Sequence, residues 1–187
     1  MYFSDQYVPS DSERMLLYRE LDNLAASQHL DDDLAAYRSR LTDRFGAIPD
    51  VAEELIRVVP LRVCGKQLGI EKIVLKQSKM NLYFVSNPDS PYFQSEAFGR
   101  ILDYVGHNPK RCNFHETAGK RSVIIADVPS VDAALTICRE ILSSGHTFPP
   151  LSILFPLLSR RGARRVGWSD RFLILLRFLA RFLPLTQ

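Results

Sequence analysis

Residues 68–76 read LGIEKIVLK, and the spacing of the apolar side chains changes within this stretch. Up to Gly69, apolar residues recur every three or four positions, which is typical of amphipathic helices. From Lys72 onward the period is two, with Ile73 and Leu75 on one face against Lys72, Val74 and Lys76 on the other, as in a half-buried strand. The chain is therefore predicted to begin with helices and to continue with strands.

Three helices are predicted before this point, at roughly 11–26, 32–45 and 50–68. Ser10 begins a capping box for the first helix, and Gly46 offers a left-handed stop to the second. Pro60 is expected to kink or split the third, because proline removes a backbone donor and clashes with the preceding turn. Met15 and Val51 are counted among the inward-facing residues of these helices.

Two ββα units are predicted after this point, at about 70–106 and 110–144. The first has strands at 72–76 and 82–85 around a polar turn at 77–81, then a helix from Ser90-Pro91 to Gly106. The second has strands at 111–116 and 121–126, then a helix from Ser130 to Gly145. The expected fold class is α+β, in which three N-terminal helices precede two ββα units that form a small sheet covered by helices.

The charge of the chain divides its 187 residues into two parts. Residues 145–187 carry seven Arg and one Asp, or 7 − 1 = +6, whereas the first 144 residues hold 17 bases and 20 acids, or −3. We therefore expect a domain at 1–145 and, outside it, an Arg/Leu-rich tail at 146–187 that is irregular or an amphipathic helix. Because the domain is net acidic and its six lysines are scattered in the sequence, no direct nucleic-acid contact is expected for residues 1–145.

No constellation in the sequence indicates an enzyme. Gly119-Lys120 is not followed by Ser or Thr, as a phosphate-binding loop requires. His107, Cys112 and His115 lack a fourth ligand, and Cys112 and His115 would project to opposite faces of a strand. We expect no catalytic residue, cofactor or metal. The three widely spaced cysteines favour a reducing compartment and hence a cytoplasmic protein.

The stretch at 41–49, LTDRFGAIP, together with Tyr7-Val8-Pro9 and Leu68-Gly69-Ile70, resembles the C-terminal domain of the bacterial transcription-repair coupling factor (Mfd) family. The resemblance covers about residues 1–145. It implies a parent protein that is an ATP-driven DNA translocase, displaces stalled RNA polymerase and recruits the excision-repair protein UvrA. The ATPase motifs belong to other domains of that parent, so this chain is expected to be noncatalytic.

The resemblance also implies a partner and a contact. In the family this last domain packs on a UvrB-like module, hides the surface that meets UvrA and so restrains the parent factor. Asp43 matches the family's acidic contact positions, Arg44 follows it, and Arg40 stands where the family often has Glu. Phe45, Gly46 and Pro49 are interpreted as the anchor, the left-handed residue and the rigid restart of the turn.

An alternative interpretation rests on the tail. Arg160-Arg161, Arg164-Arg165 and the segment from Trp168 to Leu183 would form a basic amphipathic helix in a free-standing adaptor that binds a membrane surface or nucleic acid. The abrupt change of composition is equally typical of appended or frame-shifted sequence.

Overall fold

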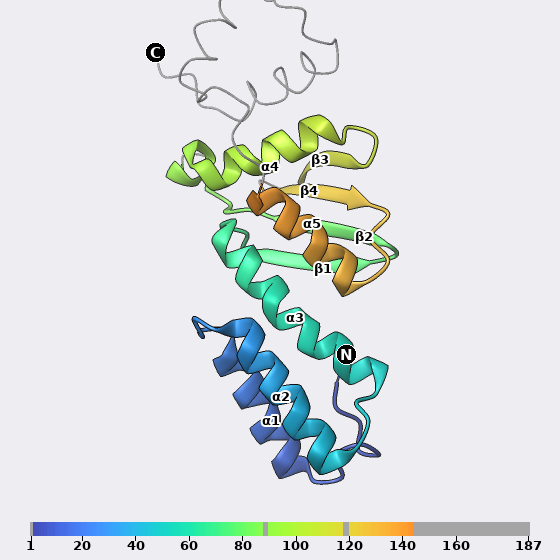
Figure 1. Ribbon diagram of the computed structural model, residues 1–187. Helices are drawn as coiled ribbons and strands as arrows, with labels where there is room; N and C mark the ends of the chain where they lie inside the picture. The colour runs from blue at the N-terminus through green and yellow to red at the C-terminus, as the bar shows by residue number, and fades with distance from the viewer. Residues whose placement is uncertain (1, 88–89, 118–119, 144–187) are drawn as a thin grey trace, which may run out of the picture. The chain divides into compact units, whose positions relative to one another are not determined.

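The computed structural model describes residues 2–87, 90–117 and 120–143, and its α+β fold confirms the predicted class (Figure 1). Its elements, in order, are α1 (Asp11–Leu24), α2 (Leu30–Phe45), α3 (Asp50–Gln67), β1 (Lys72–Lys76), β2 (Lys79–Tyr83), the 3₁₀ helix η1 (Pro91–Gln94), α4 (Glu96–His107), β3 (Cys112–Thr117), β4 (Lys120–Ala126) and α5 (Val131–Ser143). Contacts group residues 1–64 and 130–138 into a first unit and residues 65–129 and 139–143 into a second.

The first unit is built on three amphipathic helices, of which α1 and α2 lie side by side (Figure 1). The hydroxyl oxygen of Ser10 accepts from the Glu13 N–H, which confirms the predicted cap of α1. One core joins the helices to the N-terminal segment, and its buried members are Phe3, Val8, Leu21, Leu34, Tyr37, Leu41, Ala52, Ile56 and Val59. Each large side chain in this core contributes roughly 1.5–3 kcal/mol by leaving water.

Three details of the helices differ from the sequence-based expectation. Met15 and Val51 are exposed, not inward-facing. Helix α3 runs without a break through Pro60. Pro60 is buried between the buried side chains of Val59 and Leu61, so the packing of this segment offsets the roughly 3 kcal/mol that an internal proline costs.

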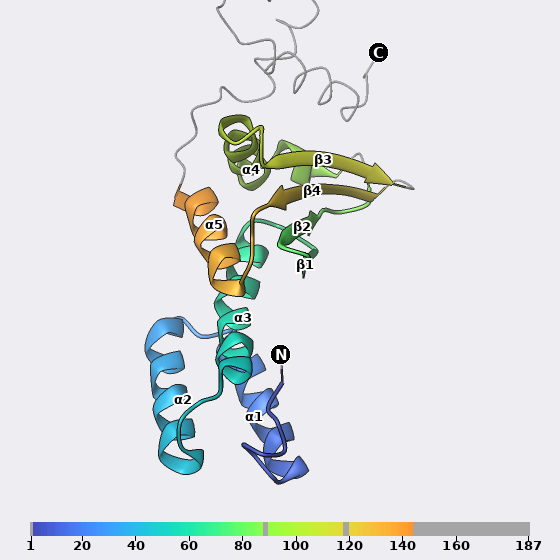
Figure 2. The ribbon, with the colours of Figure 1, turned by 90° about the vertical axis from the view of Figure 1, so that its right-hand side faces the viewer.

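The second unit contains an antiparallel sheet of order β1-β2-β4-β3 (Figure 2). Residues alternate between its two faces, and the buried face includes Met80, Leu82, Val123 and Ile125, none of which is exposed to solvent. The turn between β1 and β2 is shorter than predicted. It consists only of Gln77 and Ser78, which have φ angles of 52° and 53°.

The helix predicted from Ser90 to Gly106 is interrupted. Ser90 caps η1, and Ser95 ends η1 and caps α4 by accepting from the Phe98 N–H. Tyr92 of η1 packs against Gly69, whose φ is +65° and where an added Cβ would lie 2.4 Å from the ring. The Tyr92 hydroxyl donates to the Leu68 carbonyl at 2.8 Å. Gly69 is therefore required both for its backbone conformation and for close approach of this ring.

The predicted tail at 146–187, and Gly145 before it, lie outside the described residues. None of the helices in the described part of the chain is long and apolar enough to cross a bilayer.

Candidate functional site

The candidate site lies at the C-terminal end of α2. Arg40, Asp43 and Arg44 are spaced three and four residues apart, which places their side chains on one side of the helix, and all three residues are exposed. Tyr37 and Leu41 of the same helix are buried in the core. The structure thus brings together the three contact residues implied by the sequence resemblance.

The two arginines of this group are engaged within the unit. Arg40 forms an ion pair with Glu20, and Arg44 forms one with Glu13, both across to α1. The Arg44 guanidinium also lies 5.2 Å from the centre of the Phe45 ring. Because both pairs are largely exposed, each stabilises the unit by only about 0.2–1 kcal/mol. These arginines link α2 to α1 at the surface and leave part of their charge accessible.

Asp43 differs from its neighbours. Among the residues that the structure describes, its carboxylate has neither a hydrogen bond nor an ion pair, and the residue is exposed. An exposed carboxylate without an intramolecular cation is available for an ion pair with another molecule or domain. Asp43 is therefore the member of the group with the clearest capacity for an external contact.

The turn after α2 is fixed by backbone conformation and by the N-terminal segment. Gly46 has φ +82° and ψ −161° and donates its N–H to Thr42 at 2.9 Å. The predicted positive φ is confirmed, although the extended ψ differs from a left-handed helical residue. Phe45 is half-buried against Tyr7, with ring centres 5.8 Å apart. The Pro49 carbonyl accepts from the Glu53 N–H at 3.0 Å and so begins α3.

Tyr7 is a positioning residue that sequence reasoning did not assign. Its hydroxyl lies 3.3 Å from the Leu41 carbonyl and 3.2 Å from the Gly46 carbonyl, on either side of Asp43 in the chain. Burial raises the pKa of Tyr7, which keeps this donor protonated. Tyr7 thereby couples the N-terminal segment to the end of α2 that carries the candidate site.

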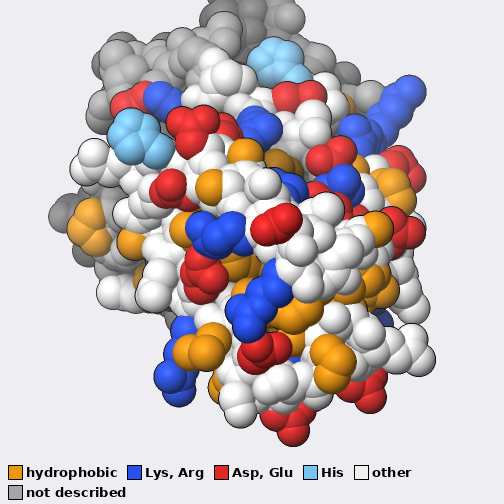
Figure 3. Space-filling model, turned by 60° about the horizontal axis from the view of Figure 1, so that its bottom comes forward, with side chains coloured by type: hydrophobic (Ala, Val, Ile, Leu, Met, Phe, Trp, Pro, Cys, Tyr) orange, Lys and Arg blue, Asp and Glu red, His pale blue; other side chains and the backbone are white. Residues whose placement is uncertain are grey.

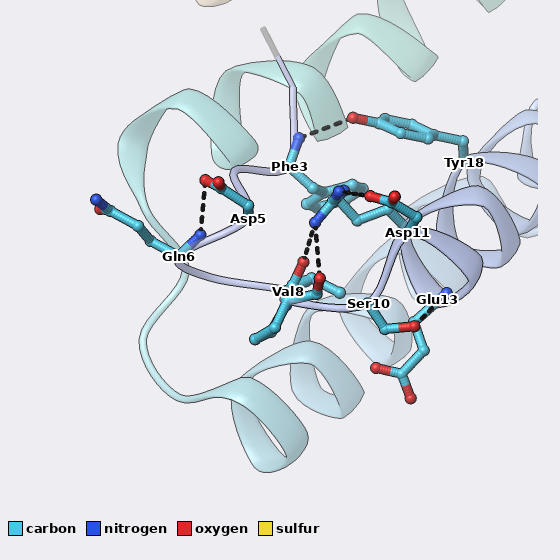
Figure 4. Close-up of polar contacts among 10 residues, drawn as sticks. Phe3, Asp5, Gln6, Val8, Ser10, Asp11, Glu13 and Tyr18 are labelled. Atoms are coloured by element: carbon cyan, nitrogen blue, oxygen red, sulfur yellow. Dashed lines mark hydrogen bonds and ion pairs between the residues drawn. The ribbon is translucent and has the colours of Figure 1, made fainter.

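The N-terminal segment is itself held in place by α1 (Figure 4). The Phe3 N–H donates to the Tyr18 hydroxyl at 2.9 Å, and the two rings lie 5.2 Å apart. Arg14 donates to the Pro9 carbonyl at 3.3 Å and pairs with Asp11. The segment therefore supports the candidate site as part of the folded unit.

An apolar side chain accompanies the charges. Leu16 of α1 is 62% exposed, and its position in the helix lies between Glu13 and Glu20, the two residues that pair with the arginines. The adjacent Met15 is 55% exposed. The face of the molecule in Figure 3 shows acidic and basic side chains interspersed with exposed hydrophobic ones. Such a mixed surface suits a protein contact better than the binding of a small molecule.

The potential chemistry elsewhere is limited in the part of the chain that the structure describes. There, no three His, Cys, Asp or Glu side chains gather as a metal site would require. Cys112 is buried and His115 is exposed, as expected for opposite faces of β3. Burial raises the pKa of the Cys112 thiol to about 11, which disfavours the reactive thiolate.

Comparisons with known proteins bear on the same region. The family model described as the TRCF domain matches residues 1–95, which is more than half of the chain and includes the whole candidate site. The chain belongs to the TRCF domain family.

The relatives of this TRCF domain are parts of much larger proteins. It is 29% identical over 72 residues to the transcription-repair-coupling factor of Helicobacter pylori. This alignment covers 38% of this chain and 7% of that protein. It is 32% identical over 69 residues to the corresponding factor of Escherichia coli, in an alignment that covers 37% of this chain and 6% of that protein. The aligned region thus spans less than a tenth of either relative.

The fold of the TRCF domain is also similar to a solved structure. The crystal structure of a C-terminal domain of transcription-repair coupling factor matches with a TM-score of 0.55 at 15% identity, over 75% of this chain and 86% of that one. At this identity the match supports the shared fold. The functional assignment depends on the TRCF family match and on the residues of the site.

Proposed function

We propose that this TRCF domain is a noncatalytic regulatory module that docks on a UvrB-like module of its coupling factor through the C-terminal end of α2. The observation that carries the proposal is the exposed Asp43 carboxylate, which has no intramolecular partner among the described residues. Family membership and the mixed polar and apolar surface beside Asp43 support it.

The electrostatics of this surface suit a contact that forms and opens. A basic side chain of the partner would pair with Asp43, while Leu16 supplies apolar area that excludes water. Interdomain contacts of modest size and mixed polarity hold at rest and yield when a ligand or partner favours another arrangement. Arg40 and Arg44 are paired with Glu20 and Glu13 of α1, so they compete less strongly with the partner's basic side chain for the Asp43 carboxylate.

Masking is the functional consequence of this docking. With the domain in place, the surface of the UvrB-like module that meets UvrA is covered, and release of the domain exposes it. The domain then acts on UvrA and RNA polymerase only indirectly, through the state of the parent factor. The parent factor performs the ATP-driven translocation with its other domains.

The experiment is a binding measurement between the full chain and the purified UvrB-like module. We expect Asp43→Arg to weaken association by at least about tenfold at low salt, because an attraction becomes a repulsion. Asp32→Arg is the matched control, since Asp32 is an exposed carboxylate at the opposite end of the same helix.

The Asp43 effect should shrink at high salt as screening shortens the range of the interaction to a few ångströms. Equal affinities for Asp43→Arg and the unaltered chain would remove Asp43 from the contact. Equal losses for Asp43→Arg and Asp32→Arg would show a general effect of net charge and would likewise contradict the proposal.

A further inference from the structure

The sheet of the second unit has a second face that the docking surface does not use. The register places these residues on it: Lys72, Val74 and Lys76 of β1, Lys79, Asn81 and Tyr83 of β2, Lys120, Ser122, Ile124 and Ala126 of β4, and Asn113 and His115 of β3. We call this set the open sheet face. Its lysines, Asn113 and His115 are exposed, in contrast to the apolar residues of the opposite face.

Positive charge is concentrated on the open sheet face. It carries four of the six lysines of the first 144 residues, although they are separated in sequence. Among the described residues, none of these four lysines forms an ion pair. Glu116, the one acid within the described strands, lies on the opposite face of the sheet, where it pairs with Arg121. The net charge of −3 for residues 1–144 therefore conceals a basic surface.

The tip of the β1–β2 hairpin places two of these charges side by side. Lys76 and Lys79 are direct cross-strand partners, and like charges in this position destabilise a sheet. The turn between them holds Gln77 and Ser78 in left-handed conformations that residues other than glycine adopt at a cost. Both features are unfavourable for the isolated fold, and an anion bound between the two ammonium groups would offset the repulsion.

Protection of sheet edges explains only part of this pattern. Lysines on edge strands prevent pairing with other chains, and Lys72 and Lys76 lie on the edge strand β1. Lys79 and Lys120 lie on β2 and β4, which are the two central strands. Their charge therefore requires a different explanation.

The interior of the open sheet face carries groups suited to nucleobases. Tyr83 is half-buried and lies between Lys72 and Ser122 across the sheet, with His115 beyond. Asn81 lies in the adjacent row and is also half-buried. An aromatic ring beside a cation on an open antiparallel sheet can stack a base while the cation neutralises a phosphate.

We propose that the open sheet face binds single-stranded nucleic acid, with phosphates at the lysines and a base stacked on Tyr83. This inference differs from the expectation drawn from net charge and scattered lysines, because strand pairing gathers the lysines. It concerns the second unit and is independent of docking through Asp43 in the first.

The test is fluorescence anisotropy of a labelled oligothymidylate of about 12 nucleotides with the full chain at low salt. Lys79→Glu and Lys66→Glu make the same charge change on and off the open sheet face, since Lys66 is exposed on α3. We expect Lys79→Glu to weaken binding at least about tenfold and Lys66→Glu less than about twofold, and each lost phosphate contact to lower the salt slope by about 0.7. Tyr83→Leu should weaken binding at least about fivefold through loss of stacking.

The residues of the tail are the same in every variant, so a difference between two variants comes from the substituted residue. Absence of binding by the unaltered chain, or equal losses for Lys79→Glu and Lys66→Glu, would overturn the proposal. The proposal would also be overturned if Tyr83→Leu left the affinity unchanged and polyglutamate competed for the chain as well as unlabelled oligothymidylate does. That result would indicate an acidic protein segment as the ligand. If Tyr83→Leu lowers the thermal stability, a second measurement takes its place: the unaltered chain is titrated with the oligonucleotide, and the amide chemical shifts of Asn81, Tyr83 and His115 are followed. Absence of chemical-shift changes at these residues would refute the assignment.

Discussion

Replacement of Gly46 by alanine tests the turn that positions the candidate site. An added Cβ at this position would meet no atom within 4 Å, so steric contact with neighbouring residues contributes nothing. The whole effect comes from the backbone, which at φ +82° and ψ −161° occupies a region essentially restricted to glycine. We expect Gly46→Ala to lower the free energy of unfolding by about 1–3 kcal/mol.

The sign of this change is diagnostic. Where the native conformation suits alanine, replacing glycine stabilises a protein by about 0.4–1 kcal/mol, because the unfolded chain loses freedom. Urea unfolding followed by far-ultraviolet circular dichroism separates the two outcomes, with Ala47→Ser, an exposed change one residue later, as the control. Stability equal to or above that of the unaltered chain would refute the conformation assigned to Gly46.

Two further predictions concern the stability of the first unit and the buried thiols. Arg38 and Glu53 form a half-buried pair with hydrogen bonds of 2.9 and 3.1 Å. A double-mutant cycle on this pair should give a larger coupling energy than a cycle on the exposed Arg40 and Glu20, for which we expect about 0.2–1 kcal/mol. Equal coupling energies would contradict the reasoning from burial. Burial raises the pKa of Cys112 to about 11 and that of Cys138 to about 12. Their contribution to the free energy of unfolding is therefore fully present below the thiol's ordinary pKa of 9 and is lost as the pH rises toward the folded-state values. Denaturant unfolding at a series of alkaline pH values should show this decline, and a rise in stability above pH 9 would contradict it.

The sequence predicted the elements well where local signals agreed with packing. Ser10 is found as a cap, Gly46 has a positive φ, and the change of period near Gly69 separates helices from strands. The split expected at Pro60 does not occur, because the cost of an internal proline is local, whereas the burial that offsets it is tertiary. The hairpin turn was predicted too long because Gln77-Ser78 lacks the Asn-Gly signature of a two-residue turn.

The two surfaces differ in how far they could be predicted. The grouping of Arg40, Asp43 and Arg44 follows from helical spacing alone. The spacing does not predict that Arg40 and Arg44 form ion pairs while Asp43 forms none, because Glu13 and Glu20 come from another helix. The sequence analysis did not predict the open sheet face, because its residues are distant in sequence and only the pairing of the strands brings them together. The alternation of Lys72, Val74 and Lys76 was the signal that could have indicated it.

The measurement that tests the central claim most directly is competition on the UvrB-like module. The full chain is bound to that module at low salt, and UvrA is then added at increasing concentration. Docking that masks the UvrA surface predicts mutually exclusive binding, with UvrA displacing the chain, and Asp43→Arg lowering the UvrA concentration required. A stable complex that contains the chain, the module and UvrA together would contradict the account.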